Sequence, residues 1–214
     1  MPKLAAAGKP MKSCLAIMRQ VLPTTLVMSD CTAALRQQLA AHAAACPTQA
    51  GLSEEFGQLL DAADNPFLRK RLAGHFTGSA WLVSADGQRA LLMHHRKLGR
   101  WLQPGGHADG DTDLAAVALK EAQEESGLPA LRLEDGRIFD LDRHWIPERG
   151  QVAGHWHFDV RYVVRCTGSE RFTANAESLA LAWREVSEIA TDPASDDSLA
   201  RMARRWLGSQ ERVG

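Results

Sequence analysis

The sequence lacks the features that define several classes of protein. No stretch of about 18 apolar residues is available to cross a membrane, and there is no internal repeat or low-complexity tract. Charge of one sign is not in excess either, since 25 Lys and Arg face 26 Asp and Glu, for a formal net charge of -1. Proteins that bind nucleic-acid backbones are usually clearly basic. We therefore expect neither a membrane protein nor a partner of nucleic-acid polymers.

Cysteine is scarce, and the four thiols form no C-x-x-C pair. They stand at Cys14, Cys31, Cys46 and Cys166. Such scattered residues fit neither a disulfide framework nor a zinc site. We expect free thiols in a reducing compartment, which predicts a cytoplasmic protein. With 214 residues, 45% of them hydrophobic and 24% charged, the chain has the composition of a globular protein whose core needs no disulfide.

The chain divides into three segments. Residues 1–28 contain no acidic residue, and basic residues interrupt their apolar stretch, which predicts a disordered N-terminus rather than a secretory signal. Residues 29–72 are predicted to form a helical extension, because strong helix formers dominate residues 33–45 and a second short helix is expected over 53–63. Residues 73–214 are predicted to form the main domain.

The main domain carries strand and helix signals in alternation. An Asp-Gly pair at residues 86–87 predicts a tight turn between two strands, and Gly127 stands where a helix is expected to end. A loop rich in Gly is expected over residues 99–110. The expected strands are 76–83, 90–94, 131–140, 156–165 and 179–186, and the expected helices are 114–125 and 198–207. This order predicts an α/β chain of the α+β type, with a mixed sheet and helices on its faces.

Acidic residues concentrate on one turn of the first of these helices. Glu121, Glu124 and Glu125 are spaced i, i+3 and i+4, which places the three carboxylates on one face. Residues 105–128 hold six acids and a single base, Lys120. Three adjacent carboxylates repel one another unless a cation lies among them. Oxygen ligands without cysteine favour Mg²⁺ or Mn²⁺.

A solvated acidic helix face would explain the same charges, but two observations count against it. Apolar residues spread around the helix instead of forming one stripe, as expected for a helix that is covered on more than one side. The preceding loop contains Pro104, Gly105 and Gly106, and a glycine backbone can approach a ligand or metal ion closely. We therefore favour a metal site.

The acidic segment resembles the Nudix box, G-x5-E-x7-R-E-U-x-E-E-x-G-U, in which U is a bulky aliphatic residue. The resemblance is carried by Gly106, Lys120, Glu121, Glu124, Glu125, Gly127 and Leu128. Three positions depart from the pattern, with Thr112 in place of the first glutamate, Lys120 in place of the arginine and Ala122 in place of the aliphatic residue. The resemblance implies a Nudix-like mixed sheet sandwiched between helices, here with a small N-terminal helical extension.

The same resemblance implies a divalent-metal-dependent hydrolase that cleaves the pyrophosphate bond of a nucleoside diphosphate derivative or a related diphosphate. Three glutamates would hold Mg²⁺ or Mn²⁺, namely Glu121, Glu124 and Glu125. One of them would take a proton from water. The Gly105 carbonyl is a further candidate ligand, and Lys120 would orient the carboxylates. Glu177, ahead of a late strand, is the candidate for a fourth carboxylate.

Two other functions stay open. A non-catalytic Nudix-like module that binds a nucleotide or metabolite is favoured by the departures at Thr112 and Lys120. A diphosphate isomerase on the same fold would use histidines to hold a second metal ion. The N-terminal helices either cover the substrate site or form the interface of a homodimer, and both arrangements stay open.

Histidines gather around the segment H-W-H-F-D-V-R-Y. Strand alternation places one set of polar residues on the same face, namely His155, His157, Asp159 and Arg161. This face is either solvated or part of a binding cleft. Together with His107 and His144, the imidazoles could contact a phosphate or bind a metal ion. We expect four residues to line the substrate pocket: His107, His157, Asp159 and Arg161.

Two further groups have both a functional and a structural interpretation. Trp101 could stack on a base of the substrate, or it could belong to the core. Three arginines of the final helix are expected to form a solvated face, namely Arg201, Arg204 and Arg205.

Overall fold

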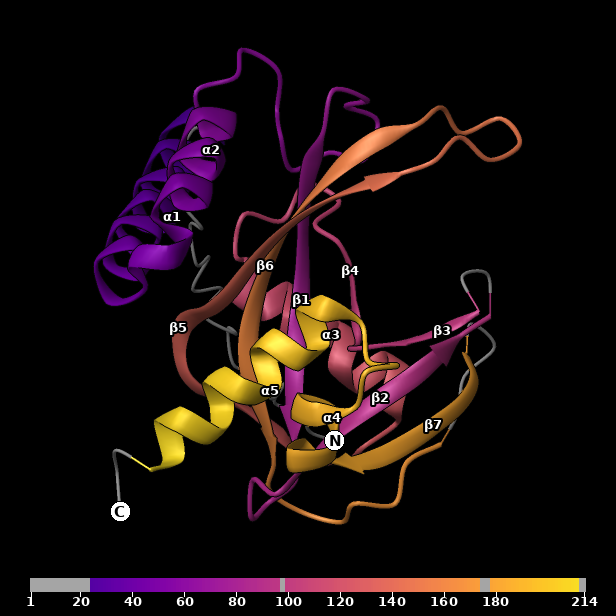
Figure 1. Ribbon diagram of the computed structural model, residues 1–214. Coiled ribbons are helices and arrows are strands. Elements are labelled where there is room, and N and C mark those ends of the chain that lie inside the picture. The colour runs from indigo at the N-terminus through magenta and orange to yellow at the C-terminus, as the bar shows by residue number, and fades with distance from the viewer. Residues whose placement is uncertain (1–23, 97–98, 174–177, 212–214) are drawn as a thin grey trace, which may run out of the picture.

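The computed structural model describes residues 24–96, 99–173 and 178–211, with side chains described from residue 32 onward except at residue 178. The helices are α1 (Thr24–Ala45), the short 3-10 helix η1 (Pro47–Gln49), α2 (Ala50–Leu60), α3 (Leu114–Ser126), α4 (Val186–Thr191) and α5 (Asp197–Gln210). The strands are β1 (His75–Val83), β2 (Arg89–His95), β3 (Arg100–Leu102), β4 (Gly105–His107), β5 (Leu131–Ile146), β6 (His155–Cys166) and β7 (Ser178–Glu185). Figure 1 shows their arrangement.

Within the described residues, seven strands form one mixed sheet whose main path is β3-β2-β1-β6-β5. β1 and β6 run parallel, in a register from His75 opposite His157 to Val83 opposite Arg165. β4 pairs antiparallel with β1, and β7 pairs antiparallel with β2. The Gly-rich stretch at 99–110, expected to be only a loop, therefore contains β3 and β4, and the predicted mixed sheet is confirmed.

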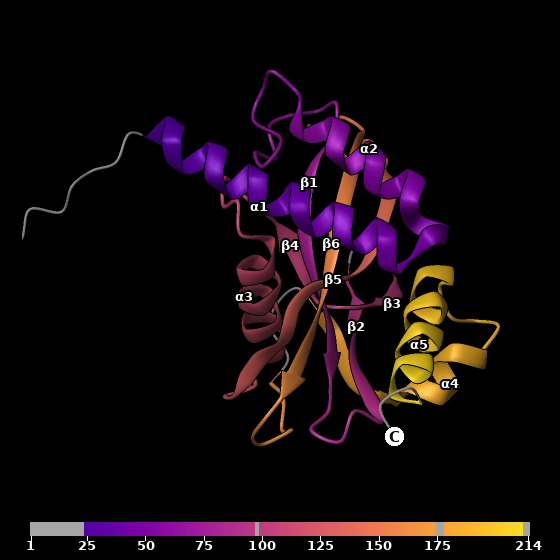
Figure 2. The ribbon, with the colours of Figure 1, turned by 90° about the vertical axis from the view of Figure 1, so that its left-hand side faces the viewer.

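Helices cover both faces of this sheet, as Figure 2 shows with α3 on one side and α4 and α5 on the other. All nine residues of β1 are buried, because the strand lies between these two layers. At Gly78 an added Cβ would lie 2.7 Å from the carbonyl oxygen of Leu114. Glycine at this position is what allows α3 to lie so close to β1.

The N-terminal helices differ from the sequence prediction at both of their starts. α1 begins at Thr24, so the predicted disorder of residues 1–28 is wrong for residues 24–28, and the remainder of that prediction lies outside the described residues. α2 begins at Ala50 instead of residue 53. No helix of the described part is long and apolar enough to span a membrane.

The helical extension packs into the core of the main domain. The Phe56 and Phe67 rings each contact the Phe76 ring of β1, with centroid distances of 6.0 and 5.1 Å. A buried polar contact adds to this packing, because the Gln49 amide donates to a carboxylate oxygen of Asp140 at 3.0 Å. The extension and the sheet therefore share one hydrophobic core.

Two of the three arginines of α5 do not belong to the solvated face that the sequence suggested. Arg201 donates to the Asp140 carboxylate at 2.7 Å and to the Asp142 carboxylate at 3.1 Å, and Arg205 donates to the carbonyl oxygen of Phe139. Arg204 donates to the carbonyl oxygen of Ala190 and is exposed, as predicted. The prediction was wrong for Arg201 and Arg205 because β5 lies beside α5 and supplies their acceptors.

Candidate functional site

The acidic helix α3 has well-defined ends. The Asp113 side chain accepts a hydrogen bond from the Ala116 backbone N–H at 3.0 Å, which is the standard N-cap contact. Gly127 ends the helix in the left-handed conformation with φ of 64°, as its position predicted. Between these caps the helix presents Glu121 and Glu125 to the neighbouring strand β4.

β4 lies against the acidic turn, and its two glycines make this approach possible. The Gly105 N–H donates to Glu125 Oε2 at 3.0 Å, and Glu125 is only 4% exposed. A Cβ at Gly106 would lie 2.5 Å from the carboxyl carbon of Glu121, so a larger residue there would displace this carboxylate. A Cβ at Gly105 would lie 2.1 Å from Ser79 Oγ, so Gly105 is required by the contact of β4 with β1.

Lys120 lies beside the same carboxylates. Its Nζ is 3.6 Å from Glu121 Oε1 and 3.7 Å from Glu124 Oε2. Lys120 and Glu124 are both largely exposed, so each ion pair contributes less than about 1 kcal/mol. The lysine thus partly neutralises the charge of the acidic turn.

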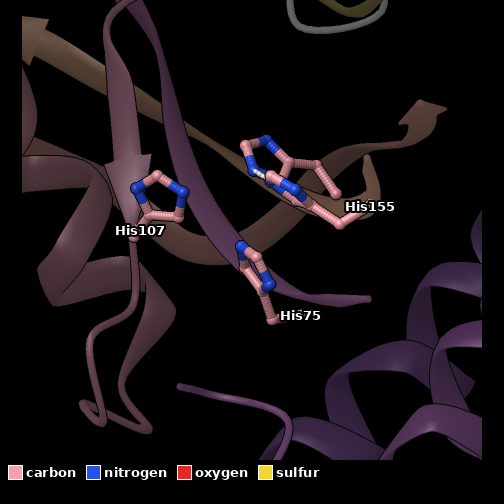
Figure 3. A group of neighbouring side chains, drawn as sticks. His75, His107 and His155 are labelled. Carbon is pink, nitrogen blue, oxygen red and sulfur yellow. Dashed lines mark hydrogen bonds between the residues drawn. The ribbon is translucent and has the colours of Figure 1, made fainter. Parts of the chain in front are cut away.

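Four imidazoles form a second cluster of chemically active groups. They come from three strands, with His75 on β1, His107 on β4, and His155 and His157 on β6. One ring nitrogen of each lies within 4.8 Å of the corresponding nitrogen of every other member. Figure 3 shows the labelled rings of His75, His107 and His155 turned toward one another.

The membership of this histidine cluster differs from the set that sequence analysis named. His75 was missed, and it joins the cluster because the parallel register places it opposite His157. Only the pairing of β1 with β6 could have revealed it. His144 lies next to the cluster, with its ring centroid 5.3 Å from that of His157, but its Nδ1 is hydrogen-bonded to the Asp142 carboxylate at 3.0 Å.

Burial lowers the pKa of three imidazoles of this cluster. It brings the pKa of His107 to about 4 and that of His157 to about 2; neighbouring histidines act in the same direction on both, and Asp109 opposes the shift of His107. Burial also lowers the pKa of His75. Near neutral pH, these rings therefore offer lone pairs instead of positive charge.

Asp159 and Arg161 lie on the same face of β6 as the histidines, as alternation predicted, but this face is not solvated. Each is 2% exposed. The Asp159 carboxylate accepts hydrogen bonds from Thr77 Oγ1 at 2.8 Å and Ser79 Oγ at 2.7 Å, and Arg161 Nε donates to it at 2.7 Å. The solvated alternative is wrong because α5 lies over this face of the sheet and side chains of β1 and β5 pair with the two charges.

The buried charges continue into β5. Arg161 also donates to Asp140, which is fully buried, at 3.2 Å and lies 3.2 Å from an Asp142 carboxylate oxygen. Burial raises the pKa of Asp142, but hydrogen bonds and charges from His144, Arg161 and Arg201 outweigh it and hold the pKa well below its ordinary value. We call this group, Asp140, Asp142, Asp159, Arg161 and Arg201, the buried ion network.

Trp101 borders a surface hollow of about 520 Å³ between the β2-β3 edge and the helices α4 and α5. The ring is half-buried and packs against the core cluster around Trp81, so it is a core contact and a wall of the hollow at once. Arg100 and Arg184 also line this hollow. Glu177, the predicted fourth carboxylate, lies outside the described residues.

Comparisons with known proteins agree with this architecture. A family model described as NUDIX domain matches residues 75–206. Two Mycobacterium tuberculosis proteins, from strains CDC 1551 / Oshkosh and ATCC 25618 / H37Rv and both named "Putative 8-oxo-dGTP diphosphatase 3", are 32% identical over 133 residues. The match covers 56% of this chain and 57% of each relative, so the chain spans little more than half of their length.

Solved structures show the same fold at low sequence identity. The MutT protein of Methanosarcina mazei Go1 is 16% identical with a TM-score of 0.51, covering 66% of this chain and 98% of that protein. The Ap4A hydrolase of C. elegans in a binary complex is 15% identical with a TM-score of 0.50, covering 64% and 97%. The family model matches more than half of the chain, and the Nudix fold predicted from the acidic segment is confirmed. This chain belongs to the NUDIX domain family.

Proposed function

We propose that this protein is a divalent-metal-dependent pyrophosphohydrolase, which cleaves the pyrophosphate bond of a nucleoside diphosphate derivative or a related diphosphate. The observation that carries the proposal is the contact between β4 and the acidic turn of α3. There, the backbone of Gly105 and Gly106 lies directly against the carboxylates of Glu125 and Glu121. A loose acidic surface would not need a glycine at residue 106 to accommodate the Glu121 carboxylate.

The donor groups at this contact fit Mg²⁺ or Mn²⁺, because they are all oxygen atoms. Glu121, Glu124 and Glu125 would hold the ion, with the Gly105 carbonyl as a further ligand. A bound ion of this kind neutralises the charge of a diphosphate and lowers the pKa of a water molecule. Glu177 is retained as a proposed fourth carboxylate.

Residues of the chain supply the remaining functions, which are positioning and proton transfer. Glu125 is buried and held by the Gly105 N–H, so its carboxylate is positioned before substrate binds. One of the three glutamates takes the proton of the attacking water. Lys120 keeps the Glu121 and Glu124 carboxylates oriented by charge, since its Nζ lies within 4 Å of both.

The hollow beside Trp101 lies between the β2-β3 edge and the helices α4 and α5, on the opposite face of the sheet from α3, so we assign no part of the substrate to it. Stacking of Trp101 on the organic part of the substrate stays a prediction. Asp159 and Arg161, expected to touch substrate, have their charged groups engaged inside the protein. We therefore propose that they act by holding β1 and β6 in place. A reducing compartment such as the cytoplasm stays a proposal that rests on the scattered cysteines of the sequence.

The non-catalytic binding module is the alternative, and it rests on Thr112 and Lys120. Lys120 lies close to two carboxylates, as an orienting residue would. Only an assay of turnover separates the two functions.

The test is a substrate screen with Mg²⁺ and with Mn²⁺. The panel holds nucleotide sugars, dinucleoside polyphosphates, NADH and deoxynucleoside triphosphates including 8-oxo-dGTP, and phosphate-containing products are measured. On any substrate found, we expect Glu121→Gln and Glu125→Gln to lower kcat by about 10²-fold or more. The control is Glu188→Gln, at an exposed glutamate of α4. Binding without turnover across the panel, or full activity in both site variants, would refute the proposal.

A further inference from the structure

The histidine cluster has the composition and geometry of a metal site that is separate from the acidic turn. Its four members, His75, His107, His155 and His157, supply nitrogen only, with one donor atom each. These donor atoms all lie within 4.8 Å of one another. Four donors from three different strands converge on one small volume, and no carboxylate or thiol of the described residues belongs to the group.

Backbone carbonyls orient two of these rings in the way that metal-binding histidines require. His75 Nδ1 lies 3.0 Å from the Arg71 carbonyl oxygen, and His155 Nδ1 lies 2.8 Å from that of Ala153. A carbonyl can only accept, so each Nδ1 carries the proton. In a neutral ring, Nε2 then carries the lone pair. Donation from the other ring nitrogen to a carbonyl is the usual support of a histidine that ligates a metal ion.

The two oriented Nε2 atoms differ in their partners, because that of His75 has none among the described residues and that of His155 has the His157 ring. His75 Nε2 is buried and has no hydrogen-bond partner. An unsatisfied buried polar atom costs stability, so such atoms are rare. His155 Nε2 lies 3.2 Å from His157 Nε2. That separation is close to the roughly 3.3 Å edge of a tetrahedron of nitrogens around an ion with bonds of about 2.0–2.1 Å.

The ligand type selects the class of ion. Imidazole suits borderline transition metals such as Zn²⁺, Cu²⁺ and Ni²⁺, whereas Mg²⁺ and Mn²⁺ prefer oxygen. Four protein ligands in a tetrahedral set are typical of a closed, structural Zn²⁺ site, which leaves no open position for a reacting water.

We propose that His75, His107, His155 and His157 bind one Zn²⁺ ion that fastens β4 to β1 and β6. In this proposal, His107 and His157 bind the metal ion instead of contacting the substrate as expected from the sequence. Successive residues of a strand point to opposite faces, so Gly106 faces Glu121 while His107 faces the other imidazoles. Zn²⁺ on one face would thereby hold the strand that borders the acidic turn on the other. The proposal does not depend on the proposed hydrolysis.

The test uses the full chain without an affinity tag, because a polyhistidine tag would bind the same ions. The protein is dialysed against a chelator and then titrated with Zn²⁺ by calorimetry, with an excess of Mg²⁺ present. Metal content is measured by mass spectrometry. We expect one Zn²⁺ per chain, and we expect Co²⁺ in its place to give the intense visible absorption of a tetrahedral Co²⁺ complex. Failure of the folded wild-type chain to bind Zn²⁺ would overturn the proposal.

Variants locate the ion. His155→Ala and His107→Ala should each weaken Zn²⁺ binding by more than about 100-fold, since even loss of an outer-shell partner costs about 10–100-fold. His94→Ala is the matched control, at a half-buried histidine of β2 outside the cluster, and should bind as wild type does. Circular dichroism shows whether each variant is folded. If His155→Ala does not fold, Zn²⁺ binding by the His107→Ala chain decides the test, because His107 is partly exposed.

A second comparison separates this site from the acidic turn. Glu121→Gln with Glu125→Gln in one chain should lose turnover and still bind one Zn²⁺. Zn²⁺ bound by the histidine variants but lost from this glutamate variant would place the ion at the acidic turn and refute the histidine site. Absence of turnover in the wild-type chain would leave the Zn²⁺ measurement unaffected.

Discussion

The two faces of β4 differ in how their chemistry is assembled. On one face, Gly106 meets Glu121, and the three carboxylates of the acidic turn come from a single helix. On the other face, His107 meets imidazoles from β1 and β6 that are 32 or more residues away in the chain. Helical spacing alone brings the carboxylates together, whereas the histidine cluster exists only after β1 and β6 have paired. A site built within one element can be read from its spacing, and a site built across strands cannot.

The largest effect on stability is expected when the buried ion network is disrupted. Arg161→Met leaves Asp140 and Asp159 buried without their shared guanidinium, so we expect a loss of about 3–5 kcal/mol in the free energy of unfolding. Urea denaturation measures it. The control, Arg137→Met, removes an exposed ion pair with Asp135 and should cost less than about 1 kcal/mol. Equal stability of the two variants would contradict the structural role given to the histidine face of β6.

Zn²⁺ should stabilise the chain by binding the histidine cluster on one face of β4, and it should not act through the acidic turn on the other face. At a concentration 100 times its Kd, it should add about 2.7 kcal/mol to the stability of the chelator-treated chain, because it binds only the folded state. Thermal unfolding checks this, and hydrogen exchange should slow at residues 105–107. The His155→Ala chain is expected to gain no stability. A gain of the same size from Mg²⁺ would contradict the distinction between nitrogen and oxygen sites.

Gly106→Ala tests the other face. The added Cβ would meet the Glu121 carboxyl carbon at 2.5 Å, so the end of this side chain must move away from β4. Because the displaced carboxylate is a proposed metal ligand, we expect kcat to fall by about tenfold or more, which corresponds to about 1.4 kcal/mol in the activation free energy. Binding of Zn²⁺ should be retained. The control is Gly208→Ala on α5, where an added Cβ meets nothing within 4 Å. If Gly106→Ala is as active as this control, the close contact between Gly106 and Glu121 plays no part in the proposed reaction.

The smallest effect is expected at Lys120. Its ion pairs with Glu121 and Glu124 are long and the lysine is exposed, so Lys120→Ala should lower kcat/KM by less than about fivefold. Lys120→Arg should keep or slightly raise activity, because the planar guanidinium orients two carboxylates better. Steady-state kinetics of both variants measures the difference. A loss of more than 100-fold in Lys120→Ala would mean that the lysine touches the substrate itself.

Local features of the fold were the most predictable. The hairpin at residues 86–87 and the end of α3 at Gly127 followed from turn and cap chemistry, which needs only neighbouring residues. The strands β3 and β4 were missed because each has three residues, too few for a period to be recognised. They exist because β2 and β1 offer them unpaired edges.

Polar residues were harder to interpret than apolar ones. Alternation along β6 correctly placed His155, His157, Asp159 and Arg161 on one face. Whether that face meets water or protein depends on what packs against it, and here β5, β1 and α5 supply partners for its charges. The same reason explains the error at Arg201, whose acidic partners lie about 60 residues earlier in the chain.

The sequence by itself determined the charge balance that argues against nucleic-acid polymers, the helix with three carboxylates on one turn, and the glycines that precede it. Each of these depends on residues that are close in the chain. The tertiary structure decided that the glycines belong to a strand lying against that turn, that His75 joins the histidines of β6, and that Asp159 and Arg161 are buried. These outcomes depend on strand pairing over long sequence separations, which residue spacing does not encode.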